Sequence, residues 1–159
     1  MHPRAAALIA ELRLEPHPEG GHYRQVYKSA SRVVLADSGA TRTALTTIFF
    51  LLPAGDISRW HRVSADEVWH FYEGAPLELL TADAAFATTG RHILGPVNGD
   101  GLRPVHVVAA NDWQAARTTG DYTLVGCTVG PGFEFADFQM LRDQPDVAAT
   151  VRRDHPHLA

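Results

Sequence analysis

Short runs of alternating apolar and polar residues recur along most of this chain. Glycine, proline, asparagine and aspartate clusters separate these runs at near-regular intervals. Because successive strand residues point to opposite faces of a sheet, the pattern predicts short antiparallel strands in an all-β sandwich or barrel. The predicted strands cover residues 23–28, 44–52, 57–63, 67–72, 77–81, 91–94, 105–108, 113–117 and 122–129.

A helical pattern is confined to the beginning of the chain. Leu8, Ile9 and Leu12 have helical spacing and Pro3 suits a first turn, so residues 3–12 predict a short N-terminal helix. Later, the Asn-Gly-Asp-Gly sequence of residues 98–101 predicts a long hairpin loop. Residues 133–141 fit either a final strand or a short helix, and we expect residues 142–159 to form a surface tail.

Length and composition predict one compact domain. At 159 residues, with 45% hydrophobic and 20% charged residues, the chain can build one core but hardly two. We therefore expect a single domain over residues 1–159, with a barrel core at about residues 20–141. A net charge of −4 favours neither nucleic acid nor an anionic membrane as partner, and no apolar run reaches membrane-spanning length.

The N-terminus and the single cysteine bear on location. No signal-peptide pattern precedes the first helix, and Cys127, standing alone, excludes an intramolecular disulfide. Both features favour the reducing cytoplasm. Cys127 lies in an apolar strand pattern, which predicts an inert buried thiol.

Residues 55–74 contain the best candidate chemistry. His61 lies on one predicted strand, and Glu67 begins the next after a short turn. The inward face of a small barrel is either packed with side chains or lines a ligand cavity, so His61, Glu67, Trp69 and Phe71 predict one wall of a pocket. The alternative is that His61 and Glu67 form a hydrogen-bonded polar pair with no function beyond the fold.

The spacing of Gly55, His61, Glu67 and Gly74 resembles the first signature of the cupin superfamily. Cupins usually place a second histidine two positions after the first, where this chain has Val63. The counterpart of the second cupin signature is residues 109–118, in which Gln114 stands in place of the usual last histidine. Cupins usually hold their metal with three histidines and one glutamate. At those four positions the resemblance places His61, Val63, Glu67 and Gln114.

Two further stretches narrow the resemblance. Residues 17–27, beginning His-Pro-Glu-Gly-Gly-His-Tyr-Arg, and residues 125–138 are similar to the fifth cupin family, whose members are small, mostly uncharacterised, sugar-epimerase-like proteins. The resemblance covers about residues 12–141. It implies a double-stranded β-helix, also called a jelly-roll or cupin barrel, with the short helix packed outside.

The aligned donor set is poor for a transition metal. Val63 offers no donor atom, and the neutral carbonyl oxygen of Gln114 suits calcium or magnesium better than zinc or iron. We therefore expect no obligatory cofactor. A divalent metal, where one binds, would be held by His61, Glu67 and Gln114.

Basic and aromatic residues complete the candidate site. Arg59 shares strand parity with His61, and Arg24 lies at a loop-to-strand junction, so both are predicted to clamp an anionic group. The alternative for Arg24 is a structural ion pair. The remaining predicted substrate-binding residues are Tyr23, Trp69, Phe71, Trp113 and Gln114.

Two classes of function stay open, both with a small-molecule ligand. The first is a metal-independent isomerase or epimerase acting on a sugar-like or carbonyl-containing substrate. His61 would be the base, Glu67 would orient its ring, and Gln114, Arg59 or Tyr23 would stabilise an enolate-like oxygen. The second is a non-catalytic module that binds its ligand in an aromatic cage of Trp60, Trp69, Phe71 and Trp113. A weakly metal-dependent enzyme using His61, Glu67 and Gln114 is a variant of the first.

Assembly is the last expectation. Small barrels leave open sheet edges that are stabilised by pairing, and cupins are often dimers, so we predict a two-fold homodimer. Light scattering at micromolar protein concentration checks this prediction, and a monomeric mass would contradict it.

Overall fold

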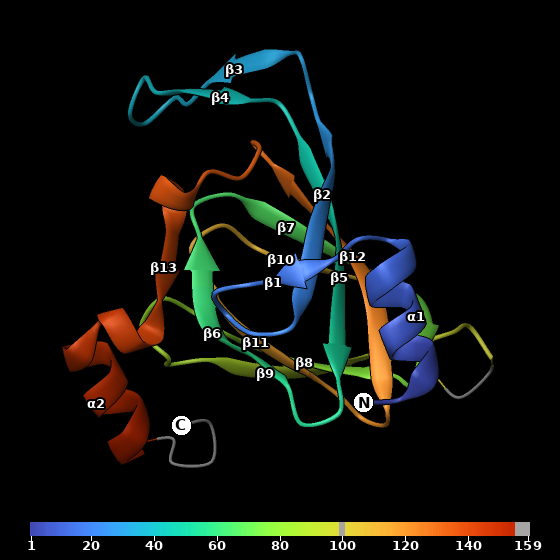
Figure 1. The fold of residues 1–159 in the computed structure, drawn as a ribbon. Helices are drawn as coiled ribbons and strands as arrows, with labels where there is room; N and C mark the ends of the chain where they lie inside the picture. The colour runs from blue at the N-terminus through green and yellow to red at the C-terminus, as the bar shows by residue number, and fades with distance from the viewer. Residues whose placement is uncertain (99–100, 155–159) are drawn as a thin grey trace.

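Two antiparallel sheets pack face to face in the computed structural model, which describes residues 1–98 and 101–154 (Figure 1). The first sheet, in spatial order, contains β1 (Glu15–Pro16), β2 (His22–Lys28), β5 (Thr46–Pro53), β12 (Tyr122–Gly130), β7 (Asp66–Gly74) and β10 (Val105–Val108). The second contains β13 (Phe138–Met140), β6 (Ile57–Val63), β11 (Trp113–Thr118), β8 (Leu77–Ala82) and β9 (Thr89–Leu94). The predicted all-β jelly-roll barrel is confirmed.

Strand alternation places the main core between the sheets. On β5, Phe50 and Leu52 point inward while Leu51 points to the opposite face. The inward residues pack with Trp69 of β7 and with apolar residues of β8, β9 and β12. This packing follows the period of two that the sequence displays, and all nine predicted strands are present.

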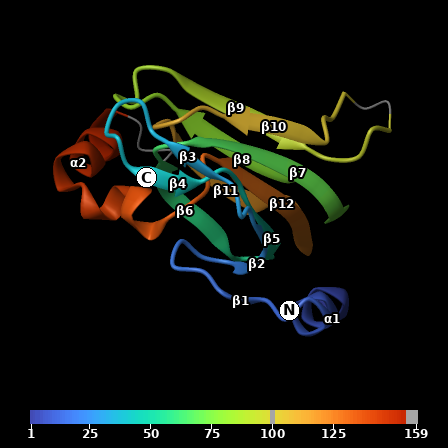
Figure 2. The ribbon, with the colours of Figure 1, turned by 90° about the horizontal axis from the view of Figure 1, so that it is seen from above.

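A helix covers the outer face of the six-stranded sheet. In α1 (Pro3–Glu11), the side chain of His2 caps the first turn by accepting the Arg4 backbone N–H at 3.2 Å. Figure 2 shows α1 beside the six-stranded sheet. Ala5 and Leu8 are buried against Leu51 and against other residues of that outer face. Both the predicted helix and its position outside the barrel are confirmed. In the described part of the chain, no helix has the length and apolar character needed to cross a membrane.

The end of the chain differs from the predicted surface tail. Residues 145–154 form α2 (Pro145–Asp154), whose Ala148 and Val151 are buried on the outer face of the five-stranded sheet. They contact a cluster that contains Trp113 and Phe86. The prediction failed because α2 has only a few apolar residues, too few to indicate a buried helix by themselves. Their role is clear only when Trp113 is known to point outward and to provide a surface on which they pack. The rest of the expected tail, residues 155–159, lies outside the described residues.

Three other segments can be compared with their predicted secondary structure. Residues 133–141 contain both predicted alternatives, since η1 (Phe135–Asp137) and η2 (Leu141–Asp143) flank β13. Two short strands, β3 (Arg32–Val34) and β4 (Thr41–Thr43), were not predicted and form a separate hairpin that projects from the barrel in Figure 1. The hairpin loop predicted at residues 98–101 falls partly on residues 99–100, outside the described part.

Docking of α2 gives a stability prediction. Val151 is 1% exposed and packs in the cluster with Trp113, so Val151→Ala should lower the free energy of unfolding by about 2 kcal/mol, because it leaves a cavity in packed surroundings. Urea unfolding measures this change. Ala149→Ser, at an exposed position of the same helix, should change it by less than about 0.5 kcal/mol. Equal effects of the two substitutions would show that α2 is not docked.

Candidate functional site

A cavity of about 200 Å³ lies inside the barrel between the two sheets. Its volume is below the roughly 300–1,000 Å³ of sites for drug-sized ligands, so it suits a small molecule. One part of the lining is polar, from His17, Glu19, His61 and Glu67, and the other is aromatic, from Tyr23, Phe50, Phe133, Phe135 and Phe138.

The loop that closes one side of this cavity is a tight turn over residues 17–21, which we call the plug loop. The Gly20 N–H donates to the His17 carbonyl, and the His17 N–H donates to the Gly21 carbonyl, both at 3.0 Å. Gly20 has a φ of +118°, and a Cβ there would collide with the Ile57 carbonyl of β6. Glycine therefore lets the loop lie directly on β6, and this close approach directs Glu19 into the barrel.

Glu19 is a buried carboxyl held from several sides. It is 6% exposed, and its Oε1 accepts the Ser58 hydroxyl at 2.6 Å. Its Oε2 lies 3.4 Å from Nε2 of His61 and 3.3 Å from Nδ1 of His17. Its backbone carbonyl accepts the Arg59 N–H at 3.0 Å. The backbone and the carboxyl of Glu19 are thus both fixed to β6.

The hydrogen-bond pattern determines where the protons lie. Nδ1 of His61 is 2.8 Å from the Arg59 carbonyl, which only accepts, so that nitrogen carries hydrogen and Nε2 presents a lone pair in the neutral ring. Nδ1 of His17 accepts the Glu19 backbone N–H at 3.3 Å. Both ring nitrogens facing Glu19 Oε2 are therefore acceptors, and neutral rings require a proton on that oxygen.

Burial also favours the protonated form of the Glu19 carboxyl. It raises the pKa of Glu19 from 4.5 to about 7, an increase that the neighbouring His17 and the Ser58 hydrogen bond only partly oppose. Burial also lowers the pKa values of His61 and His17. Glu19 therefore takes up and releases its proton near neutral pH, beside imidazoles that burial keeps neutral. A carboxyl in this pKa range is suited to acid–base chemistry.

Glu67 has a different environment from the one predicted. Its Oε2 accepts the Gln114 amide N–H at 2.6 Å, and Gln114 Oε1 in turn accepts the Trp69 indole N–H at 2.8 Å. Burial raises the pKa of Glu67, and the negative charge of Glu19 raises it further. The predicted orientation of the His61 ring by Glu67 is wrong, since the Arg59 carbonyl holds that ring.

Cys127 is buried and its pKa is raised well above the usual value, in agreement with an inert thiol.

The residues at the cupin metal positions do not fit a metal in this chain. Val63 is 5% exposed and apolar, and the one donor oxygen of Gln114 is occupied by the Trp69 N–H. Coordination of an ion by this oxygen would compete with the buried hydrogen bond from Trp69, and losing that bond is costly. Within residues 1–98 and 101–154, no group of three or more His, Cys, Asp or Glu residues is arranged to hold a metal ion.

Neither predicted arginine enters the cavity. Arg24 is exposed and donates to the Leu12 carbonyl at 3.2 Å. Arg59 points outward because β6 contains a bulge: Gln114 pairs with His61 but Ala116 pairs with Ser58, which leaves one extra residue on β6. A bulge of this kind reverses strand parity, so Ser58 points inward and the anion clamp predicted from parity is wrong.

The predicted aromatic cage is also wrong. Trp113 and Trp60 face outward toward α2, and Trp69 is completely packed in the main core. Phe71 packs against that core as well, and neither it nor Gln114 lines the cavity. Of the predicted substrate-binding residues, only Tyr23 lines the cavity, together with the predicted pair His61 and Glu67.

Sequence reasoning missed Glu19 and the position of His17. The signal lay in the His-Pro-Glu-Gly-Gly sequence, whose two adjacent glycines indicate a close backbone approach. The aromatic residues at the mouth, Phe133, Phe135 and Phe138, were also missed, because they lie in and around short 3-10 turns that have no strand period.

Comparisons with known proteins agree with the geometry. A family model described as "Cupin superfamily (DUF985)" matches residues 6–141. A hypothetical protein from Leishmania major is 31% identical, with 85% of each chain covered and a TM-score of 0.79. A protein of Shewanella oneidensis is 35% identical, with 86% of this chain and 83% of that chain covered and a TM-score of 0.76.

A more distant structure shares the fold alone. The dTDP sugar isomerase from Desulfovibrio desulfuricans G20 is 12% identical, with 80% of this chain and 85% of that chain covered and a TM-score of 0.52. No curated protein matches the sequence.

The raised pKa of Glu19 predicts a dependence of stability on pH. Between pH 4.5 and about 7 the unfolded chain has released the Glu19 proton while the folded protein retains it, so this group's contribution is fully present below pH 4.5 and is lost as pH rises to about 7. Glu19→Gln stays neutral throughout. Relative to that variant, the natural protein should lose roughly 3 kcal/mol of unfolding free energy over this range, at about 1.4 kcal/mol per pKa unit.

Urea unfolding at a series of pH values measures this difference. Glu15→Gln, an exposed carboxylate two residues before the plug loop, is the matched control and should show a difference that stays constant with pH. A difference between the natural protein and Glu19→Gln that stayed constant as well would contradict the buried, proton-holding carboxyl.

Proposed function

Because the chain belongs to the cupin superfamily, within its DUF985 family, we propose that it is a metal-independent isomerase or epimerase of a small carbonyl-containing molecule. The proposal rests on the contact between Glu19 and His61, which lie 3.4 Å apart in the lining of the barrel cavity, and on the pKa of Glu19, which burial raises to about 7. The dTDP sugar isomerase noted above shows only a shared fold at 12% identity, so the proposal rests on this pair.

The proposed reaction is a proton transfer at carbon. With Glu19 ionised, the Glu19–His61 pair accepts the proton next to a substrate carbonyl, and the electrons of the broken C–H bond form an enolate. The Tyr23 hydroxyl, on the aromatic side of the cavity, donates to the developing oxyanion. Return of a proton to the other face of the same carbon, with the enol oxygen giving its proton back to Tyr23, completes epimerisation. In isomerisation the proton returns to the former carbonyl carbon, and the adjacent hydroxyl gives its proton to Tyr23 as it becomes the new carbonyl, so neither reaction needs a co-reactant.

The lining supports a neutral substrate. Among the described residues that line the cavity there is no arginine or lysine, whereas two carboxyl groups lie on its polar side. A substrate carrying a phosphate or carboxylate inside this cavity would meet like charge in a low-dielectric site. An uncharged sugar or a hydroxy-ketone fits the polar end, and its C–H face fits the aromatic rings.

The second candidate is a binding module without turnover. It is favoured by the aromatic mouth, where Phe133, Phe135 and Phe138 pack around one another at ring-centroid distances of 5.1–6.2 Å and Phe135 stays 56% exposed. Rings of this kind bind sugar faces with or without chemistry. Hydrogen exchange at carbon separates the two functions, because binding alone leaves C–H bonds intact.

The isomerase proposal predicts incorporation of solvent deuterium. In D2O, the protein should introduce deuterium next to the carbonyl of at least one member of a panel of uncharged ketoses and aldoses, as measured by mass spectrometry. Glu19→Gln and His61→Gln should each reduce the rate by about 100-fold or more, since each removes the general base.

Two controls make this experiment decisive. Arg24→Gln, outside the cavity, should leave the rate unchanged, and addition of EDTA should do the same. A rate lost with EDTA and restored by a divalent cation would overturn the metal-independent mechanism. Binding of a sugar to the cavity with no exchange above background in the whole panel would leave the binding module as the function.

A further inference from the structure

A second cavity, of about 450 Å³, lies on the opposite side of β6, between the outer face of the five-stranded sheet and the segment that leads into α2. We call it the outer groove. It shares no lining residue with the barrel cavity. Its volume falls within the range of roughly 300–1,000 Å³ that is typical of small-molecule sites, and the proposed isomerase function does not use it.

The floor of the outer groove is apolar. Ala115 of β11, Met140 of β13 and Val151 of α2 are each at most 5% exposed and contribute to its lining. Leu80 is half-buried beside them, and Ile57 is 50% exposed at the edge. Leu80 and Ile57 provide the apolar surface that water contacts, and a hydrocarbon chain that covers it would gain about 25 cal/mol per Å².

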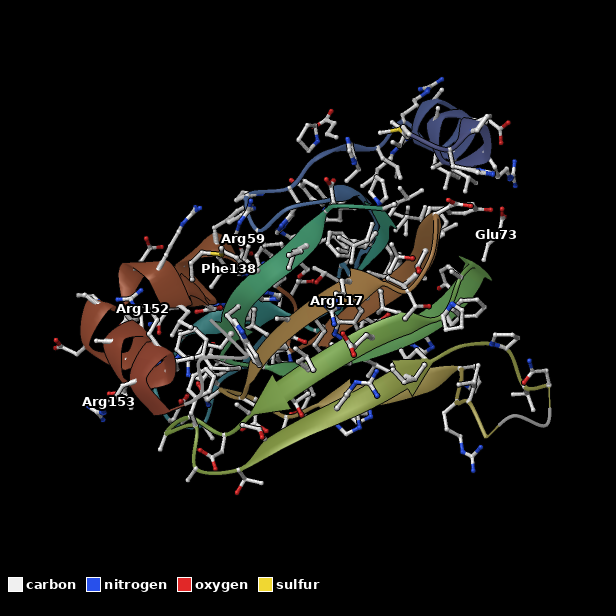
Figure 3. All side chains as sticks on the ribbon, turned by 90° about the horizontal axis from the view of Figure 1, so that it is seen from below. Arg59, Glu73, Arg117, Phe138, Arg152 and Arg153 are labelled. Carbon is white, nitrogen blue, oxygen red and sulfur yellow. The ribbon has the colours of Figure 1, made fainter. Side chains whose placement is uncertain are left out.

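The rim is strongly positive. Among the described residues that line it, Glu78 is the one carboxylate, and four are arginines: Arg59, Arg117, Arg142 and Arg152. Glu78 is itself paired with two guanidinium groups, those of Arg91 and Arg117, so it neutralises little of the remaining charge. In Figure 3, Arg59 and Arg117 lie over the five-stranded sheet and Arg152 lies on α2.

The positive charge of the outer groove is not shared by the whole molecule. The whole chain has a net charge of −4, so a gathering of four arginines over one groove is opposite in sign to the rest of the molecule. Arg59 donates to a neutral carbonyl, that of Glu19, at 3.2 Å. Arg142 is 3.9 Å from Asp143, at the limit of an ion pair between exposed groups. Neither contact removes the attraction for an anion.

From the apolar floor and the arginine rim, we infer that the outer groove binds an amphipathic anion, namely a small hydrocarbon chain that ends in a carboxylate or a phosphate. The planar guanidinium group recognises both head groups with paired hydrogen bonds. The chain would lie along Leu80, Ala115 and Val151, and the head group would face the arginines of β6 and α2. This second ligand differs in charge from the neutral substrate proposed for the barrel cavity.

Titration with matched probes tests this inference. Octanoate and octyl phosphate present the two head groups on the same chain, octanol lacks the charge, and acetate lacks the chain. At least one octyl anion should bind at least about tenfold more tightly than octanol and acetate in isothermal titration calorimetry. The tighter of the two anions identifies the preferred head group. NMR shifts should appear at the amides of Leu80 and Val151 and not at those of Glu67 and Cys127, which separates this site from the barrel cavity.

Substitutions on two different elements provide the second test. Arg59→Gln and Arg152→Gln should each weaken the preferred anion by about tenfold, which is typical of a lost charge-assisted hydrogen bond. Arg153→Gln, the next residue of the same helix and not part of the groove lining, is the matched control and should bind normally. Because Arg59 also holds the plug loop, Arg152→Gln gives an answer that is independent of the barrel.

Three results would overturn the inference. They are equal binding of octanol and both anions, shifts confined to the barrel cavity, and normal anion binding by both Arg59→Gln and Arg152→Gln. None of these results bears on deuterium exchange by the Glu19–His61 pair, so the outer groove and the proposed isomerase function can fail separately.

Discussion

The site depends on one contact, in which the Glu19 carboxyl is buried between Ser58 and His61. Moving an ionised carboxylate out of water is expensive, and a buried acid commonly avoids that cost by keeping its proton. The Ser58 hydroxyl satisfies one carboxyl oxygen, and the other oxygen faces two imidazole nitrogens that can accept its proton. The raised pKa of Glu19, and with it the proton-holding state, follows from this burial.

The departures from the usual cupin metal ligands have structural consequences of their own. Gln114 is fully buried and bridges the Trp69 indole to the Glu67 carboxylate. Each polar atom that this bridge uses is paired, and a fully satisfied buried network is rigid. At this position the chain therefore uses the side chain to organise the core and to fix Glu67, which lines the cavity.

The sequence was sufficient for the architecture because strand alternation is a local property with a fixed period. It identified the nine main strands and α1, and it placed His61 and Glu67 on the inside of the barrel. It did not identify Glu19, since a loop residue has no period and its direction depends on contacts with β6 that are distant in sequence. The outward position of Arg59 could not be predicted either, because one extra residue in β6 reverses the parity on which that prediction relied.

That same bulge connects the two surfaces of β6. Ser58, before it, holds the carboxyl of Glu19 from inside the barrel, whereas Arg59 holds the Glu19 carbonyl through its backbone N–H at 3.0 Å and its guanidinium at 3.2 Å. A group that exchanges protons must be fixed to within about 0.5 Å by neighbours that are themselves rigid. Hydrogen bonds within the turn shape the plug loop, and these two adjacent residues of a paired strand fix its position on β6. A strand without the bulge would direct Ser58 and His61 to opposite faces, and Glu19 could then contact only one of them.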